Sequence, residues 1–308
     1  MTILLLAAGL LLLLAGGEAL VRGAVSLAVR LNVSPLVIGL TLVGFGTSMP
    51  ELFTSVQAAL AGSPAIAVGN IVGSNIANVL LILGIATLLM PIAVERRALM
   101  RDGALLIGAT LLFAALCFSG SLGRGAGIAL LAGLVLYLGI LWHQERGTPA
   151  QAPQQAAPST TSPLAALLIA AAGLAMIVFG ARFLIDGAVM LARAYDISEA
   201  VIGLTVVAIG TSLPELATSI VAALRRQPDV AFGNIIGSNI FNLLGIGGVT
   251  ALIHPLEIPD AMRSVDIPVM VLVTLALLVV AWTGLRIVRV EGALLLAGFA
   301  AHQALLWT

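Results

Sequence analysis

Long apolar runs separated by short polar stretches dominate the hydrophobic pattern of the chain. Each run holds about 20 residues of mostly Leu, Ala, Val, Ile and Gly, the length that a helix needs to cross a bilayer. Ten such runs can be delimited: 3–30, 36–61, 66–90, 101–119, 124–142, 164–193, 200–224, 230–253, 266–283 and 288–306. The pattern predicts an all-α integral membrane protein with ten transmembrane helices, because the short alternating segments of a membrane barrel do not occur in these runs.

A polar segment divides the ten runs into two sets of five. Residues 147–163 are rich in Pro, Ala, Gln, Ser and Thr, a composition that is typical of a flexible linker. The first set occupies residues 1–146 and the second occupies 164–308. Because an odd number of spans precedes the linker, the second set enters the membrane from the opposite side, and we expect two inverted five-helix repeats.

The arginines predict the orientation in the membrane. All 14 positively charged residues are Arg, against 14 acidic residues. If the N-terminus lies outside, only Arg124, Arg193 and Arg263 fall in outer loops, whereas the inner loops carry Arg30, Arg96, Arg97, Arg101, Arg146, Arg225, Arg226, Arg286 and Arg289. Inner loops of membrane proteins carry the excess of Arg and Lys, so both termini are expected outside a cell membrane and the linker in the cytoplasm. The first run, from Ile3, lacks the basic start of a signal peptide and is expected to be a retained helix.

One polar motif occurs in both sets of helices. Residues 39–84 and 203–248 align at a constant offset of 164, with about 28 of 46 positions identical. Each copy contains Gly-Thr-Ser-x-Pro-Glu-Leu, at 46–52 and 210–216, followed by Gly-Asn-Ile-x-Gly-Ser-Asn-Ile-x-Asn, at 69–78 and 233–242. The alignment without gaps indicates an internal duplication.

The composition makes the acidic residue of each motif unusual. The chain is 60% hydrophobic and 9% charged, whereas a soluble domain has roughly a quarter charged residues. Glu51 and Glu215 each lie in the middle of an apolar run with no Arg within one helical turn. A carboxylate at that depth costs several kcal/mol unless it faces a partner, water or a cation. We therefore predict that a mobile cation is the partner of both.

Neighbouring residues supply further oxygen atoms. Three hydroxyl side chains lie on the helix face that carries Glu51: Thr47, Ser48 and Ser55. Pro50 and Pro214 each remove a backbone donor and are expected to free carbonyl groups near Gly46 and Gly210. Hydroxyls, carbonyls and carboxylates together form an all-oxygen site, which suits Ca²⁺ or Na⁺ and does not suit soft metals.

The third and eighth runs predict a second wall for this site. Polar residues recur every four positions in both, at Asn70, Ser74 and Asn78 and again at Asn234, Ser238 and Asn242. Gly69 with Gly73, and Gly233 with Gly237, form small-xxx-small faces that let two helix backbones approach closely. Two interpretations stay open for the amides at 70, 75, 234 and 239, which either line the site or only join helices.

Three local features predict structural roles. Ser34, followed by Pro35, is expected to cap the second helix. Glu18 and Arg22, four residues apart, are expected to pair within the first helix, as are Arg182 and Asp186 in the sixth. The single cysteine, Cys117, excludes a disulfide framework and a Cys-based metal site and is expected to be a buried hydrophobe.

On the two Gly-Thr-Ser-x-Pro-Glu and Gly-Ser-Asn-Ile-x-Asn motifs, the chain closely resembles the Ca²⁺/cation antiporter superfamily, and specifically its prokaryotic sodium/calcium exchangers. The resemblance implies a core of eight helices around the ion site. It also implies that the first and sixth helices form a long tilted pair that slides to give alternating access.

The resemblance further implies a role for each motif position. Glu51 and Glu215 resemble the central carboxylates that bind Ca²⁺ and share in binding Na⁺, and Thr47 and Thr211 would add oxygens to the Ca²⁺ site. Gly44 and Ala208 match positions that offer carbonyls to outer Na⁺ sites. The Na⁺ ligands would be Ser48, Ser212, Ser74 and Ser238, and the middle position would be lined by Asn78 and Asn242. Potassium-dependent relatives carry Asp at the position of Asn242, so potassium co-transport is not expected.

The expected function is therefore an antiporter that exchanges Na⁺ for Ca²⁺. Two alternatives stay open: a proton-driven antiporter of the same fold, because a midplane Glu can also titrate, and a membrane scaffold or sensor that does not transport. No enzymatic signature accompanies the isolated residues His143, His254 and His302, and no phosphate-binding loop occurs in the sequence. We expect no cofactor, no nucleic-acid partner and a monomer in the lipid bilayer, with Ca²⁺ and Na⁺ as transported ions.

Overall fold

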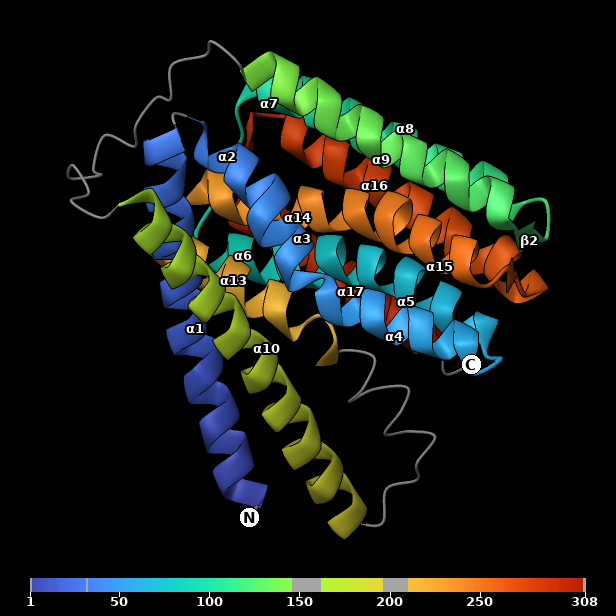
Figure 1. Ribbon diagram of the computed structural model, residues 1–308, viewed down its shortest axis with the longest axis horizontal. Helices are drawn as coiled ribbons and strands as arrows, with labels where there is room; N and C mark the ends of the chain where they lie inside the picture. Colours follow the sequence, from blue (N-terminus) through green and yellow to red (C-terminus); the bar gives the residue numbers. More distant parts are fainter. Residues whose placement is uncertain (1, 32, 146–161, 196–209, 307–308) are drawn as a thin grey trace.

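The computed structural model describes residues 2–31, 33–145, 162–195 and 210–306 and is almost entirely helical (Figure 1). Its helices in the first half of the chain are α1 (Thr2–Leu31), α2 (Pro35–Ile38), α3 (Gly44–Thr47), α4 (Met49–Leu60), α5 (Pro64–Ala77), α6 (Gly84–Leu89), α7 (Arg96–Ala98), α8 (Ala104–Cys117) and α9 (Arg124–Glu145). Those in the second half are α10 (Pro163–Ala194), α13 (Leu213–Leu224), α14 (Pro228–Ile240), α15 (Gly247–Ile253), α16 (Ile267–Trp282) and α17 (Arg289–Leu306). These bounds follow the apolar runs closely. Residues 147–161 of the predicted linker and the start of the seventh run, 200–209, lie outside the described residues.

Within the described residues, wide π-helical segments interrupt the helices at five places. They are η1 (Gly39–Val43), η2 (Asn78–Leu83), η3 (Leu99–Gly103), η5 (Phe241–Ile246) and η6 (Met262–Asp266). Segments of this kind are rare in proteins and frequently lie at functional sites. Two of them begin at or next to the predicted site residues Asn78 and Asn242.

Seven helices in the described part of the chain are long and apolar enough to cross a membrane. The bent pair Pro35–Thr47 and Met49–Leu60 would make an eighth span. The seventh run is described only as the 12-residue helix α13, and α17 is a further helix of 18 residues. The all-helical prediction is confirmed, and the count of ten spans stays a prediction.

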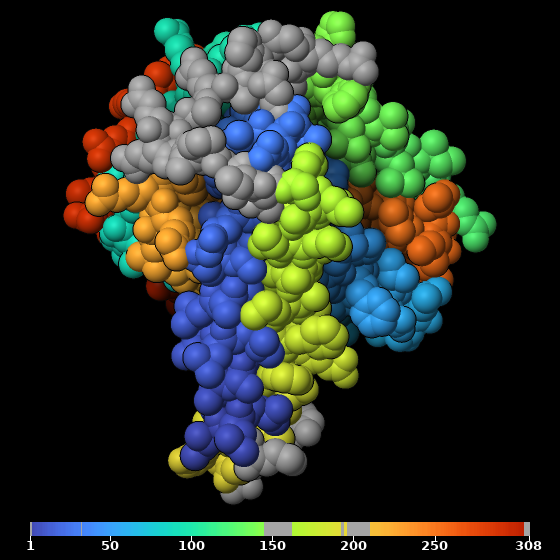
Figure 2. Space-filling model, turned by 60° about the vertical axis from the view of Figure 1, so that its left-hand side comes forward, coloured from blue at the N-terminus to red at the C-terminus, as the bar shows by residue number. Residues whose placement is uncertain are grey.

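The helices α1 and α10 form a long tilted pair at one side of the molecule (Figures 1 and 2). They run antiparallel, because Gly9 meets Gly180 and Leu184 whereas Gly16 meets Gly173. A Cβ atom on Gly16 would lie 2.8 Å from the carbonyl oxygen of Gly173. Glycine at these positions therefore lets the two backbones touch.

A charged contact ties α1 to α13. The carboxylate of Glu18 accepts a hydrogen bond from Arg225 Nε at 2.5 Å and lies 3.9 Å from Arg22 Nε. The predicted pairing of Glu18 with Arg22 is confirmed, but Arg225, which is far away in the sequence, is the nearer partner. Arg182 and Asp186 are both exposed, and the ion pairs among the described residues do not include them, so the prediction for that pair is wrong.

The helix α14 and the segment after it form the centre of the molecule. Every residue from Val230 to Gly248 is buried. Gly233 and Gly237 pack against Leu36 to Leu40, so the predicted close approach of helix backbones is confirmed there. At the matching residues Gly69 and Gly73, the described part of the chain shows no such close approach of helix backbones, and residues 200–204, which align with 36–40, lie outside the described residues.

Two short antiparallel strand pairs join the two halves of the chain. β1 (Ile92–Ala93) pairs with β4 (Arg286–Ile287), and β2 (Ser121–Leu122) pairs with β3 (Leu256–Glu257). Sequence patterns did not predict these pairs, because two residues are too few for a strand signal.

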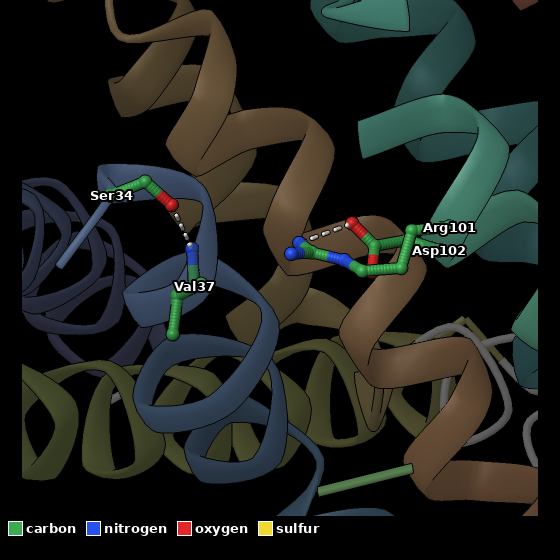
Figure 3. Close-up of polar contacts among 4 residues, drawn as sticks. All are labelled: Ser34, Val37, Arg101 and Asp102. Atoms are coloured by element: carbon green, nitrogen blue, oxygen red, sulfur yellow. Dashed lines mark hydrogen bonds and ion pairs between the residues drawn. The ribbon is translucent and has the colours of Figure 1, made fainter. Parts of the chain in front are cut away.

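Two polar contacts away from the duplicated motif fix local geometry (Figure 3). Ser34 accepts a hydrogen bond from the backbone N–H of Val37 at 3.4 Å, which confirms the predicted cap of α2. Arg101 donates to both carboxylate oxygens of Asp102, at 2.7 and 3.0 Å. Because Asp102 is buried, this two-point contact compensates for the loss of its hydration.

The cap at Ser34 gives a first prediction. Replacing Ser34 by Ala should lower the free energy of unfolding by about 1 kcal/mol, since an N-cap hydrogen bond is lost. Ser63→Ala is a matched control, because Ser63 also precedes a proline at a helix start but makes no capping hydrogen bond with its side chain. Thermal unfolding of the purified variants in detergent measures both effects. Equal losses in the two variants would contradict the assigned cap.

Candidate functional site

Two helix breaks organise the centre of the protein. Ser48 separates α3 from α4 with φ −84° and ψ 8°, and Ser212 precedes α13 with φ −89° and ψ 6°. The helices on either side of Ser48 are bent by 41°. Pro50 and Pro214 follow two residues later and lack the N–H that a continuous helix would use. The proline of each motif thus accounts for a break next to the buried acid.

Carbonyl groups near Gly46 accept donors from outside the regular helix pattern at the first break. Pro50 has no N–H to donate to the carbonyl oxygen of Gly46, four residues earlier. The carbonyl oxygen of Gly44 accepts the backbone N–H of Ser48 at 3.3 Å and the hydroxyl of Ser238, from the second half, at 3.0 Å. Gly44 is thus the carbonyl near this break that reaches the other half.

Glu51 and Glu215 lie together in the interior. Each is 1% exposed, and the two carboxylates are close enough to repel each other. Each accepts a hydrogen bond from the serine at the break in the opposite half: Ser48 Oγ donates to Glu215 Oε1 at 2.8 Å, and Ser212 Oγ donates to Glu51 Oε1 at 3.3 Å. Among the described ion pairs, none includes either glutamate.

Hydroxyl groups surround the two carboxylates. Thr47, 0% exposed, donates to Asn234 Oδ1 at 3.1 Å, and its hydroxyl lies 3.5 Å from that of Ser238. Thr211, which is also buried, donates to Asn70 Oδ1 at 3.4 Å. The structure therefore brings these predicted site residues together.

Asparagine amides from both halves form a further group of buried polar side chains. Asn78 Nδ2 donates to Asn239 Oδ1 at 2.9 Å, across the two halves of the chain. Asn242 is 0% exposed, and neither of its amide atoms has a hydrogen-bond partner among the described residues. Asn75 donates to the Ile71 carbonyl in its own helix, so it does not contact the centre through that group.

For two predicted residues, the described part of the chain shows no contact with this network. Ser74 is buried in α5, one turn before Asn78, but has no hydrogen bond to the other predicted residues within the described part of the chain. Ala208 lies outside the described residues.

Four of the buried acceptor oxygens without a partner in the described part of the chain belong to predicted site residues: Glu51 Oε2, Glu215 Oε2, Asn78 Oδ1 and Asn242 Oδ1. Buried acceptors without a partner are costly and therefore uncommon. Carboxylate and amide oxygens are the ligands that hard cations such as Ca²⁺ prefer. The arrangement can thus offer two negative charges and several neutral oxygens to a cation.

Four further residues join the elements that carry the acids. Asn70 Nδ2 donates to the Glu51 carbonyl oxygen at 3.1 Å and to Ser55 Oγ at 2.9 Å. Asn234 Nδ2 makes the same two contacts in the second half, to the Glu215 carbonyl oxygen at 3.2 Å and to Ser219 Oγ at 3.0 Å. Sequence reasoning left the two asparagines open and did not single out Ser219. Its alignment with Ser55 at the offset of 164 was the available signal.

An all-helical membrane protein with a buried, oxygen-lined polar centre has the features of a cation transporter. Comparisons with known proteins assign the chain to a particular family of transporters. The family model described as "Sodium/calcium exchanger protein" matches residues 1–143 and 165–307. The chain belongs to this family, as the motifs in the sequence predicted.

Similar proteins cover almost the whole chain. A protein of Alkalimonas amylolytica described as "Putative antiporter CaxA" is 42% identical, covering 97% of this chain and 97% of its own. The "Sodium/calcium exchanger MaX1" of Methanosarcina acetivorans is 32% identical, covering 99% of this chain and 98% of its own. A solved structure of the sodium-calcium exchanger NCX_Mj, soaked with Na⁺ and Sr²⁺, superimposes with a TM-score of 0.87 at 32% identity, covering 98% of this chain and 97% of that chain. The chain is therefore a multi-pass membrane protein with the family and fold of a transporter that exchanges cations for Ca²⁺.

Proposed function

We propose that this protein is a secondary antiporter that exchanges Na⁺ for Ca²⁺ across a cell membrane by alternating access. The observation that carries the proposal is the pair of buried glutamates, each with one carboxylate oxygen that has no partner among the described residues. Glu51 and Glu215 would bind Ca²⁺ and share in binding Na⁺. The other predicted ligands are Thr47, Thr211, Ser48, Ser212, Ser74, Ser238, Asn78, Asn242, Gly44 and Ala208.

Competition for the same oxygens would couple the two fluxes. One Ca²⁺ neutralises two carboxylates, whereas several Na⁺ ions are needed to do so. Simultaneous binding of both kinds of ion is disfavoured by repulsion and by the shared ligands. A centre carrying two uncompensated charges is costly to move across the hydrocarbon core, so only loaded states would cross.

Reciprocal contacts support two inverted five-helix repeats of ten spans in total. Ser48 contacts the acid of the second half, and Ser212 contacts the acid of the first half. A two-fold relation between the halves produces such pairs of contacts. With the arginine distribution, it supports both termini outside, the linker in the cytoplasm and a monomer that contains the complete site.

A transport assay tests the proposed function. The purified protein is reconstituted into liposomes loaded with NaCl, and uptake of radioactive Ca²⁺ from a Na⁺-free medium is measured. We expect rapid uptake that disappears when internal Na⁺ is replaced by choline at constant pH. Liposomes without protein are the control.

The same assay distinguishes sodium/calcium exchange from the proton-driven alternative. Liposomes without Na⁺ but with an acidic interior impose only a pH gradient. Uptake driven by this gradient, with none driven by Na⁺, would refute sodium/calcium exchange in favour of proton/calcium exchange. Absence of uptake in both would refute antiport of Ca²⁺.

A further inference from the structure

We propose that Asn70 and Asn234 are positioning residues that orient threonine hydroxyls of the opposite half toward the transported ion. The inference rests on the proposed function, because it concerns how the same site is held. It assigns neither asparagine as an ion ligand. Asn70 acts on Thr211, and Asn234 acts on Thr47.

Each asparagine side chain uses both ends of its amide. The NH₂ group of Asn234 donates to the Glu215 carbonyl oxygen and to Ser219 Oγ, which holds α14 against the first turns of α13. Its carbonyl oxygen accepts the hydroxyl of Thr47, in the other half. Asn234 is 0% exposed, so no water replaces these bonds from outside. Losing such a partner leaves buried polar groups unsatisfied, which is costly.

The direction of the threonine hydrogen bond gives this contact a function. A hydroxyl can coordinate a cation only through its lone pairs, so its proton must point to another acceptor. Thr47 has two acceptors for its proton, Asn234 Oδ1 at 3.1 Å and the Gly44 carbonyl oxygen at 3.3 Å, and the contact with Asn234 is the shorter. The oxygen of Thr47 is thereby left as an acceptor beside Glu215. Without Asn234, only the longer contact with the Gly44 carbonyl oxygen is left to hold the proton of Thr47 away from the ion.

The same arrangement occurs in the other half. Asn70 donates to the Glu51 carbonyl oxygen and to Ser55, and it accepts from Thr211 at 3.4 Å. Each asparagine thus connects the helix that carries one glutamate with the break that precedes the other glutamate. Joining helices alone would not require a contact with a threonine of the opposite half in both copies.

Ion binding tests the proposal more directly than activity. In Asn234→Ala we expect the KM for Ca²⁺ to rise about tenfold with a nearly unchanged maximal rate, because the lost hydrogen bonds weaken ion binding. Equilibrium binding of radioactive Ca²⁺ to the detergent-purified variant should weaken by the same factor. Asn70→Ala gives the same test in the other half if Asn234→Ala does not fold.

A double-mutant cycle with Thr47→Val tests whether Asn234 changes the KM for Ca²⁺ through Thr47. If Asn234 acts through the hydroxyl of Thr47, the double variant should raise the KM for Ca²⁺ little more than Thr47→Val alone. Additive increases would overturn the proposal. So would a KM for Ca²⁺ in folded Asn234→Ala within twofold of the unsubstituted protein.

Asn75→Ala is the matched control. Asn75 lies in α5, as Asn70 does, but it is buried and its NH₂ group donates within its own helix. We expect the KM for Ca²⁺ of Asn75→Ala to stay unchanged. If this KM rose as much as that of Asn234→Ala, the effect would come from helix packing. Failure of the unsubstituted protein to transport Ca²⁺ would refute the proposed function, whereas normal transport with unaffected asparagine variants would refute only this inference.

Discussion

Replacing either Glu51 or Glu215 by Gln is expected to abolish Na⁺-dependent Ca²⁺ uptake. Both carboxylates are buried and lie close together, and no described ion pair includes either of them. Gln keeps the shape and an oxygen but removes one of the two charges that would balance Ca²⁺. Removing one member of a buried pair of opposite charges costs about 3–5 kcal/mol. Here the pair is a carboxylate and the bound Ca²⁺, so the affinity for Ca²⁺ should fall roughly a hundredfold or more.

The same substitutions should change stability in the opposite direction when Ca²⁺ is absent. Two buried carboxylates that repel each other destabilise the ion-free protein, so removing one charge relieves that cost. We expect each Gln variant to unfold at a higher temperature than the unsubstituted protein in Ca²⁺-free buffer. It should also lose the stabilisation that added Ca²⁺ gives by binding to the folded state.

Glu257→Gln is the control for both measurements, because Glu257 is exposed and lies in β3, away from the centre. It should transport Ca²⁺ normally and unfold at an unchanged temperature. Normal uptake by Glu51→Gln or by Glu215→Gln would contradict the proposed site.

Gly237→Ala is expected to destabilise the protein by about 3 kcal/mol or more and to remove transport. A Cβ atom on Gly237 would overlap the carbonyl oxygen of Leu40 and lie 2.6 Å from its carbonyl carbon. These are backbone atoms, so they cannot move aside as a flexible side chain does. The next residue, Ser238, donates to the carbonyl oxygen of Gly44, so a shift of α14 also displaces the site.

A glycine without neighbours provides the comparison. Gly108 lies in α8 on an exposed face, and within the described part of the chain no atom lies within 4 Å of the position of its Cβ atom. Gly108→Ala should leave both the melting temperature and Ca²⁺ uptake unchanged. If Gly237→Ala were equally harmless, the close packing of α14 on residues 36–40 would be refuted.

Helix positions could be predicted from the sequence because hydrophobicity is a local property. The first run, 3–30, corresponds to α1 at Thr2–Leu31, and the third, 66–90, corresponds to residues 64–89 of α5, η2 and α6. The N-cap of α2 could also be predicted locally, because Ser34 is followed by Pro35. The family could be predicted because the two motifs carry an unusual combination of Pro and Glu within apolar runs.

Contacts between distant residues could not be predicted in this way. Nothing in the local pattern indicated that Arg225 would be the nearer partner of Glu18, because the residues are 207 positions apart. The equal spacing of Arg182 and Asp186 likewise suggested a pair that does not form. Spacing on a helix shows which residues could meet, and packing against other helices decides which do.

The sequence by itself determined that the protein crosses a membrane, that its polar motif is duplicated, and that one buried acid lies in each copy. These features follow from composition and periodicity, which need no knowledge of packing. Only the tertiary structure decided that each acid is held by the serine of the opposite half, and that asparagines 70 and 234 bridge the halves. The physical reason is that a hydrogen bond depends on the distance and direction between two groups, and the folded helices alone set both for residues so far apart in the chain.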